Sequence, residues 1–133
     1  MNVLAVGIGG FLGAIFRFLV GKMIPTPYGF PFGTVAINLL GCLFLAWFFT
    51  ITANKWKISQ NLKLAIGTGF TGAFTTFSTF SVDTLNLLKY NQILFALLYI
   101  VVSIIGGIGL SCLGVKLAAL TAQLVGKKEG DRK

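Results

Sequence analysis

The stretch GTGFTGAFTTFSTFS, residues 67–81, decides how the rest of this chain is interpreted. It contains three glycines and seven hydroxyl side chains, yet it lies inside a long apolar run. The β-branched pair Thr75 and Thr76 comes soon after Gly72. Glycine and β-branched residues are poor formers of an unbroken helix. We therefore predict a helix that is interrupted near residues 72–76.

The composition around this stretch indicates an integral membrane protein. Of the 133 residues, 56% are hydrophobic and 11% are charged, whereas soluble domains have about 45–50% and about 25%. A helix needs about 20 apolar residues to cross the hydrocarbon core, and the chain has four runs of that length or more. The predicted fold class is all-α, with four transmembrane helices at residues 3–24, 32–53, 62–88 and 93–120. Residues 1–126 form one membrane domain, followed by a basic tail at residues 127–133.

The basic residues are distributed unevenly between the two faces that four crossings would create. Both termini and the second loop share one face, whose basic residues are Lys55, Lys57, Lys63, Lys127, Lys128, Arg132 and Lys133. The opposite face has Lys22 and Lys89. The positive-inside rule then predicts a multi-pass protein of the cell membrane with both termini in the cytoplasm. We interpret the tail as a disordered, solubilising end that contacts anionic lipid and binds no nucleic acid.

Two polar residues in the first two helices each have two interpretations. Arg17 lies near the middle of a span, where a guanidinium persists only with a partner, a route to the interface or a water-filled cavity. It either snorkels to the membrane surface or lies at an aqueous vestibule, where it would concentrate anions. Asn38 either forms an interhelical hydrogen bond or donates to a substrate.

The segment after the predicted break has the chemistry of an ion path. Unwound backbone at membrane depth must be buried in protein or line a cavity, and its carbonyls commonly hold a cation. If helix resumes after the break, Phe77 and Phe80 share a face, and inward ring edges with their positive charge suit a small anion. Hydroxyl groups on the adjacent face and on the fourth helix would donate hydrogen bonds. They belong to Thr75, Ser78, Thr79, Ser81, Tyr99 and Ser103.

The sequence offers no enzymatic constellation. It has no histidine, and Asp83 is its only carboxylate before the tail. General acid–base and nucleophilic catalysis both need such groups in pairs or triads. A small multidrug-type transporter would need an acid in the first helix, where this chain has Arg17. A purely structural membrane subunit would leave the hydroxyl and phenylalanine array without a use.

Three segments resemble the Fluc (CrcB-type) fluoride channels: GGFLGAIFRF at residues 9–18, GTVAINLLG at 33–41 and GFTGAFTTFSTFS at 69–81. They occur in the family's order, and the length and four-helix layout agree over nearly the whole chain. The resemblance implies a fluoride-selective passive channel that exports fluoride and protects the cell from its toxicity. It also implies an antiparallel dimer with two fluoride pathways and a central structural sodium ion.

The same resemblance assigns roles to individual residues. The sodium ligands would be the main-chain carbonyls of Gly72 and Thr75 from each subunit. The fluoride pathway would be lined by the rings of Phe77 and Phe80, with Arg17 at the vestibule. Further pathway residues would be Asn38, Ser78, Thr79, Ser81, Tyr99 and Ser103.

This chain departs from the family pattern at two positions. Asp83 stands where the family commonly has glutamate, and Gly107 stands where another hydroxyl is expected. A proton-coupled fluoride exchanger is an alternative to the passive channel, with Asp83 as its only candidate relay within the spans. The uneven charge of the two faces leaves open whether the subunit forms a homodimer or pairs with an oppositely oriented sister chain.

Overall fold

Helical segments joined by short connections make up residues 2–54 and 56–130, the parts of the chain that this computed structural model describes. Three long helices are α1 (Asn2–Met23), α2 (Phe32–Asn54) and α6 (Ile93–Gly130). A short helical turn, Pro27–Gly29, lies between α1 and α2. The third pass is assembled from α3 (Gln60–Leu64), a π-helical segment (Ala65–Phe70), α4 (Thr71–Phe74) and α5 (Phe77–Lys89).

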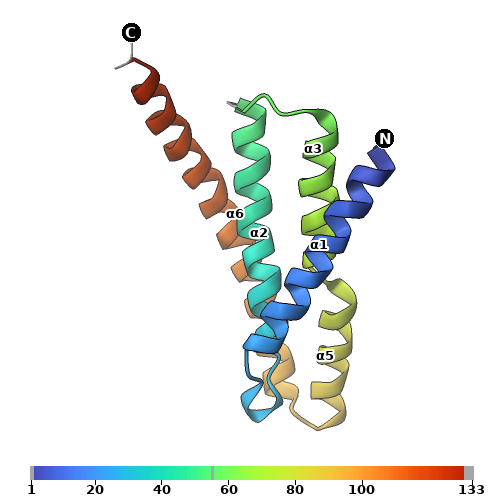
Figure 1. Cartoon of the computed structure of the whole chain (residues 1–133). Coiled ribbons are helices and arrows are strands. Elements are labelled where there is room, and N and C mark those ends of the chain that lie inside the picture. Colours follow the sequence, from blue (N-terminus) through green and yellow to red (C-terminus); the bar gives the residue numbers. More distant parts are fainter. Residues whose placement is uncertain (1, 55, 131–133) are drawn as a thin grey trace.

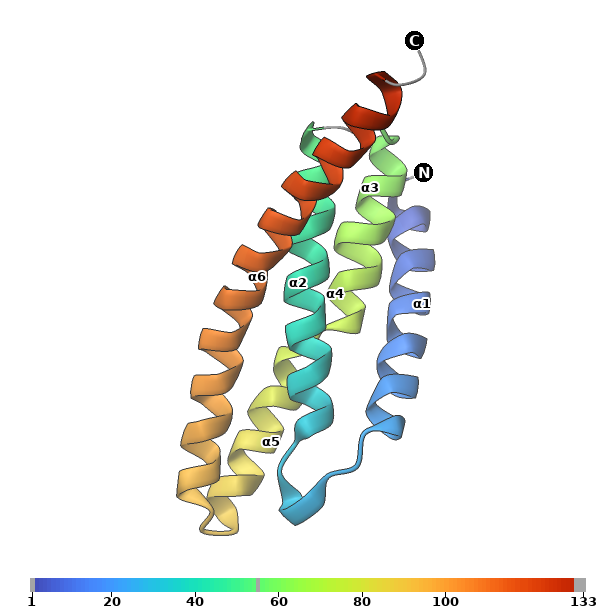
Figure 2. The same ribbon diagram turned by 90° about the vertical axis from the view of Figure 1, so that its left-hand side faces the viewer.

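The four passes run alternately up and down, so both termini lie at one end of the bundle together with the connection from α2 to α3 (Figures 1 and 2). The α1–α2 loop and the α5–α6 turn lie at the other end (Figure 1). Three helices in the described chain are long and apolar enough to cross a membrane, namely α1, α2 and Ile93–Leu124 of α6. The predicted all-helical, multi-pass architecture is thus confirmed, and the third pass has no single helix of that length.

Local sequence sets where several of these helices begin and end. Helix α1 ends at Met23, shortly before Pro25, because proline disfavours helical geometry in the residue ahead of it. Ser59 caps α3, its hydroxyl accepting from the Leu62 N–H at 3.3 Å. The turn from α5 to α6 uses Asn91 at φ 57°, the left-handed region that asparagine tolerates better than most residues.

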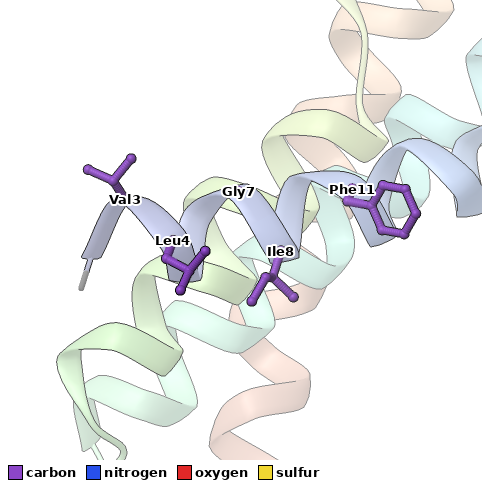
Figure 3. Close-up of a pocket in the computed structure, with 5 residues that line it drawn as sticks. All are labelled: Val3, Leu4, Gly7, Ile8 and Phe11. Atoms are coloured by element: carbon purple, nitrogen blue, oxygen red, sulfur yellow. The ribbon is translucent and has the colours of Figure 1, made fainter.

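The outer surface of the bundle is apolar, and the buried interior is small. Figure 3 shows Val3, Leu4, Ile8 and Phe11 around a shallow recess of about 620 Å³ on the outer side of α1. Val3 is 86% exposed, and many large apolar side chains of α6 are exposed as well. A soluble monomer rarely exposes such continuous apolar surface, whereas lipid or a partner subunit would cover it. The distribution agrees with a membrane protein.

Helix α1 packs closely against the π-helical segment because both have glycines at the contact. A Cβ at Gly9 would overlap the Ala65 carbonyl, and one at Gly13 would overlap the Phe70 carbonyl. From the other side, a Cβ at Gly69 would come within 2.5 Å of the Val6 carbonyl. These backbones approach more closely than any side chain permits, which is the function of small residues in membrane helix pairs.

Two boundaries differ from the sequence-based prediction. The break is confined to Thr75 and Thr76, and Gly72 remains inside α4. Helix α6 continues ten residues past the predicted end at Leu120, so the chain is helical to Gly130 where a disordered tail was predicted. Residues 116–124, KLAALTAQL, are mostly good helix formers, which explains the continuation past Leu120. Arg132 and Lys133 lie outside the described residues.

Replacing Gly13 by alanine should destabilise the fold, because the new methyl group has to displace the Phe70 carbonyl. Overpacking of this kind costs about 1–3 kcal/mol. Gly7→Ala is the matched control on the same helix, since nothing lies within 4 Å of a Cβ there. Thermal unfolding in detergent checks the prediction. Equal melting temperatures for the two variants would contradict the close contact.

Candidate functional site

The third pass is interrupted by two extended residues at the middle of the bundle. Thr75 has φ −75° and ψ 158°, and Thr76 has φ −150° and ψ 121°. Both are β-branched and therefore favour extended backbone over helix. The carboxyl end of α4 and the amino end of α5 thus meet at this point. The first is the negative end of a helix dipole and the second is the positive end of another.

The side-chain amide of Asn38, in α2, stabilises the break by two hydrogen bonds to Thr76. One is to its backbone N–H and the other to its carbonyl. The Asn38 Oδ1 accepts from the Thr76 N–H at 2.8 Å, and its Nδ2 donates to the Thr76 carbonyl at 3.0 Å. The amide therefore substitutes for the helical hydrogen bonds that the extended backbone cannot make. Of the two interpretations of Asn38, the structure contains the interhelical hydrogen bond.

Two carbonyls at the break, one in α4 before it and one within it, lose the donors that a continuous helix would provide. In a continuous helix, the Thr76 N–H would bond the Gly72 carbonyl and the Thr79 N–H would bond the Thr75 carbonyl. Here the first N–H is taken by Asn38, and the second donates to the Thr76 hydroxyl at 3.1 Å. The carbonyls of Gly72 and Thr75, which lose these donors, are the two that the resemblance to the fluoride channels assigns as sodium ligands. Carbonyl oxygens are suitable ligands for a hard cation.

A polar cavity of about 390 Å³ leads from the α1–α2 loop towards the break. It contains Arg17, Lys22 and Asp83, which are the charged residues of its lining. The other lining residues are Phe18, Gly21, Thr26, Pro31, Gly33, Thr34, Ile37, Thr76 and Thr79. Arg17 is half-buried at the wall of this cavity. This position is compatible with the vestibule interpretation of Arg17, which stays a prediction.

A second recess, of about 270 Å³, lies beyond the break. Its lining includes Asn38, Thr75 and Phe77, three of the residues that the sequence singled out. It also includes Gly41, where a Cβ would overlap the methyl group of Thr75, so α2 and the break touch directly. Thr76 lines both this recess and the polar cavity. Thr76 is therefore the one residue that the linings of the two hollows share.

Three neighbouring aromatic rings, those of Phe77, Phe80 and Tyr99, lead from the break into the bundle. The Phe77 ring is 81% exposed, and its centroid lies 5.7 Å from that of Phe80 at an interplanar angle of 31°. Phe80 in turn lies 4.9 Å from the fully buried ring of Tyr99. Phe80 also packs against the buried cluster around Val35 and Leu87. One phenylalanine of the pair thus joins the core, and the other projects outward.

Asp83 is bound by two hydroxyl groups inside the polar cavity. Thr34 donates to its Oδ2 at 2.7 Å, and the Tyr99 hydroxyl donates to the same oxygen at 3.4 Å. Asp83 therefore reaches two hydroxyl groups, although its side chain is one methylene shorter than the glutamate that the family commonly has here. The sequence had left Asp83 without a role among the pathway residues, and it did not single out Thr34. A threonine one turn before Asn38 is the signal that would have found it.

The remaining predicted residues are placed less uniformly. Thr79 accepts from the Thr76 hydroxyl at 3.0 Å, and Ser78 lies 3.3 Å from that hydroxyl. Ser81 donates back to the Phe77 carbonyl at 3.0 Å. Ser103 has a buried hydroxyl oxygen without a hydrogen-bond partner among the described residues, and it lines neither hollow. An unpaired buried hydroxyl is costly in a native protein.

The fold and these hollows define a small multi-pass membrane protein with a polar route to a helix break. The profile of the family described as "CrcB-like protein, Camphor Resistance (CrcB)" matches residues 4–115. The chain therefore belongs to this family, which confirms the resemblance drawn from the three sequence segments.

Several relatives carry the name of an ion channel. The "Fluoride-specific ion channel FluC" of Oceanobacillus iheyensis is 45% identical over 130 residues, which cover 98% of this chain and 97% of that protein. The protein of the same name from Chlorobium phaeobacteroides is 42% identical over 121 residues, or 90% and 94% of the two chains. "Fluoride-specific ion channel FluC 2" of Listeria innocua is 47% identical over 108 residues, or 81% and 83%. These are names of channels and not of enzymes, as the sequence led us to expect.

Replacing Asn38 by leucine should destabilise the protein, because the Thr76 N–H and carbonyl would both lose their partner. Each polar group left unpaired costs about 1–3 kcal/mol. Asn86→Leu, at an exposed position of α5, is the matched control. The measurements are thermal unfolding and hydrogen exchange of the Thr76 amide. An unchanged rate of hydrogen exchange at the Thr76 amide in Asn38→Leu would refute the pairing between Asn38 and Thr76.

Proposed function

We propose that this chain is the subunit of a fluoride-selective passive channel that exports fluoride across the cell membrane and so protects the cell. The observation that carries the proposal is the position of Thr76. It lines a polar cavity open towards one face and a recess that contains Phe77. An anion path with a short constriction fits this arrangement. The names of the relatives supply the identity of the ion.

In the proposed path, Arg17 draws an anion into the vestibule, and hydroxyl groups then replace its water. Fluoride is small and strongly hydrated, so a pore must offer donors while keeping each site weak enough to release the ion. The α5 amino terminus faces the break with its positive dipole end. Ser78, Thr79 and the Phe77 ring follow directly on that helix. The proposed path also includes Phe80, Asn38, Ser81, Tyr99 and Ser103.

Transport in this proposal needs no energy source. An inside-negative potential contributes about 2.3 kcal/mol per charge for each 100 mV, and it drives anions outward. Fluoride that enters as neutral hydrofluoric acid would dissociate inside and leave as the anion. A passive pore is therefore sufficient for clearance.

A second subunit completes the proposed channel. Gly72 and Phe77 are both exposed beside the break, and a Cβ at Gly72 would meet nothing within 4 Å. Such exposure of the break at membrane depth calls for a covering surface. In an antiparallel dimer, the carbonyls of Gly72 and Thr75 from both subunits would hold the structural sodium ion. The release of these carbonyls from helical bonding supports that fit.

One observation favours a second candidate, the proton-coupled fluoride exchanger. Asp83 is a carboxylate inside the polar cavity, where it accepts hydrogen bonds from Thr34 and Tyr99. A relay of this kind would couple fluoride movement to a proton gradient. An imposed pH gradient that drives fluoride against its own gradient, and that Asp83→Asn abolishes, would identify an exchanger. The passive channel requires that no such uphill movement occurs.

Purified protein in liposomes loaded with potassium fluoride should release fluoride rapidly once valinomycin carries the compensating potassium. Phe77→Ile/Phe80→Ile should slow efflux by about tenfold or more, since each aromatic contact contributes roughly 1 kcal/mol. Phe11→Ile, a 66% exposed ring on α1, is the matched control. An electrode follows the released ion.

Two further measurements in this assay test the selectivity for fluoride and the requirement for sodium. Liposomes loaded with potassium chloride should release almost nothing, and equal chloride efflux would contradict the proposed selectivity. Replacing sodium by N-methylglucamine during purification and assay should reduce fluoride efflux if the structural sodium is required. Unchanged efflux without sodium would remove the ion from the proposal.

The uneven basic residues leave open a homodimer or a pairing with a sister chain of opposite bias, and insertion of this subunit in one fixed orientation would favour the sister chain. Lys57 belongs to the α2–α3 connection and Lys63 to α3, at the end with the termini, whereas Lys22 and Lys89 lie in the last turns of α1 and α5. Those two helices end at the opposite end of the bundle (Figure 1). With a fixed orientation, membrane-impermeant maleimide applied to intact cells should label only Tyr90→Cys and not Ser59→Cys, each in a Cys42→Ala/Cys112→Ala background. Labelling of both positions would show dual insertion and favour a homodimer.

A further inference from the structure

One residue that has so far been given no role, Lys22, determines whether the lining of the polar cavity has a net charge. Its charged lining residues are Arg17, Lys22 and Asp83. In formal charges, Asp83 cancels Arg17, so the lining would be neutral without Lys22 and has one net positive charge with it. A cleft of one sign between low-dielectric walls raises the local concentration of the opposite ion. For an anion path, the sign of this cavity therefore determines how often the ion enters.

The position of Lys22 suits this task. It lies in the last turn of α1, one turn and one residue beyond Arg17, at the end of the bundle where the α1–α2 loop borders the cavity. Its side chain is exposed, so the ammonium group stays hydrated and can attract an anion without holding it. Asp83, in contrast, is half-buried and bonded to the Thr34 hydroxyl at 2.7 Å. The negative charge is fixed at the wall, and the compensating cation is at the mouth.

We propose that Lys22 is the residue that makes the cavity attractive to anions and thereby sets the rate of fluoride entry. The inference rests on the proposed channel function and adds to it a cation that raises the rate of anion entry. The alternative is that Lys22 only favours the carboxyl end of α1 through the helix dipole and contacts the membrane surface. Lys89 provides the comparison, because it ends α5 at the same face of the bundle and does not line the cavity (Figure 1).

The test compares fluoride efflux from proteoliposomes at two ionic strengths set with an impermeant potassium salt. At about 10 mM, where screening is weak, Lys22→Gln should slow efflux about threefold, and near 1 M the deficit should disappear. Lys22→Arg should retain the wild-type rate, and Lys89→Gln should match the wild type at both ionic strengths.

A second variant protects the test against a folding defect. Lys22→Cys is measured before and after reaction with a cationic or an anionic methanethiosulfonate reagent, with the wild type treated in parallel. The cationic adduct should restore efflux, and the anionic adduct should slow it further. The inference would be overturned if Lys22→Gln and Lys89→Gln slowed efflux equally. It would also be overturned if the deficit of the Lys22 variants did not depend on ionic strength or on the charge of the adduct. A wild type that passes no fluoride would instead refute the homodimeric channel on which this inference rests.

Discussion

The pairing between the Asn38 amide and the backbone of Thr76 is the constraint on which the rest of this structure depends. In a bilayer there is no water to satisfy an unwound residue, so an interrupted helix persists only if protein groups take over its hydrogen bonds. One side chain does this on both sides of Thr76, through an acceptor and a donor. The break is therefore a fixed element and not a locally frayed helix.

Fixing the break in this way determines which backbone groups become available. The donors that Asn38 and the Thr76 hydroxyl engage are those that would otherwise bond the Gly72 and Thr75 carbonyls. The same event exposes negative carbonyl oxygen at the end of α4 and positive N–H at the start of α5. A negatively polarised and a positively polarised helix end thus arise together from a single interruption.

Glycines allow the remaining elements to approach this interruption. Helix α1 reaches the π-helical segment through Gly9 and Gly13, and this contact places Arg17 along the cavity wall. Helix α2 reaches Thr75 through Gly41, at the residue where an added methyl group would collide. Close contacts at these glycines thus hold the cavity, its charges and the break next to one another.

The sequence by itself determined the all-helical membrane class, the presence of a break after Gly72 and the family, because hydrophobic run length and glycine and threonine content are local properties. It also identified the residues around the break, such as Asn38 and Phe77. Only the tertiary structure decided that Asn38 bonds Thr76, that Phe80 joins the core while Phe77 projects outward, and that Asp83 shares a cavity with Arg17 and Lys22. Residues on different helices meet according to helix packing and the exact register of each pass, and a local pattern contains neither.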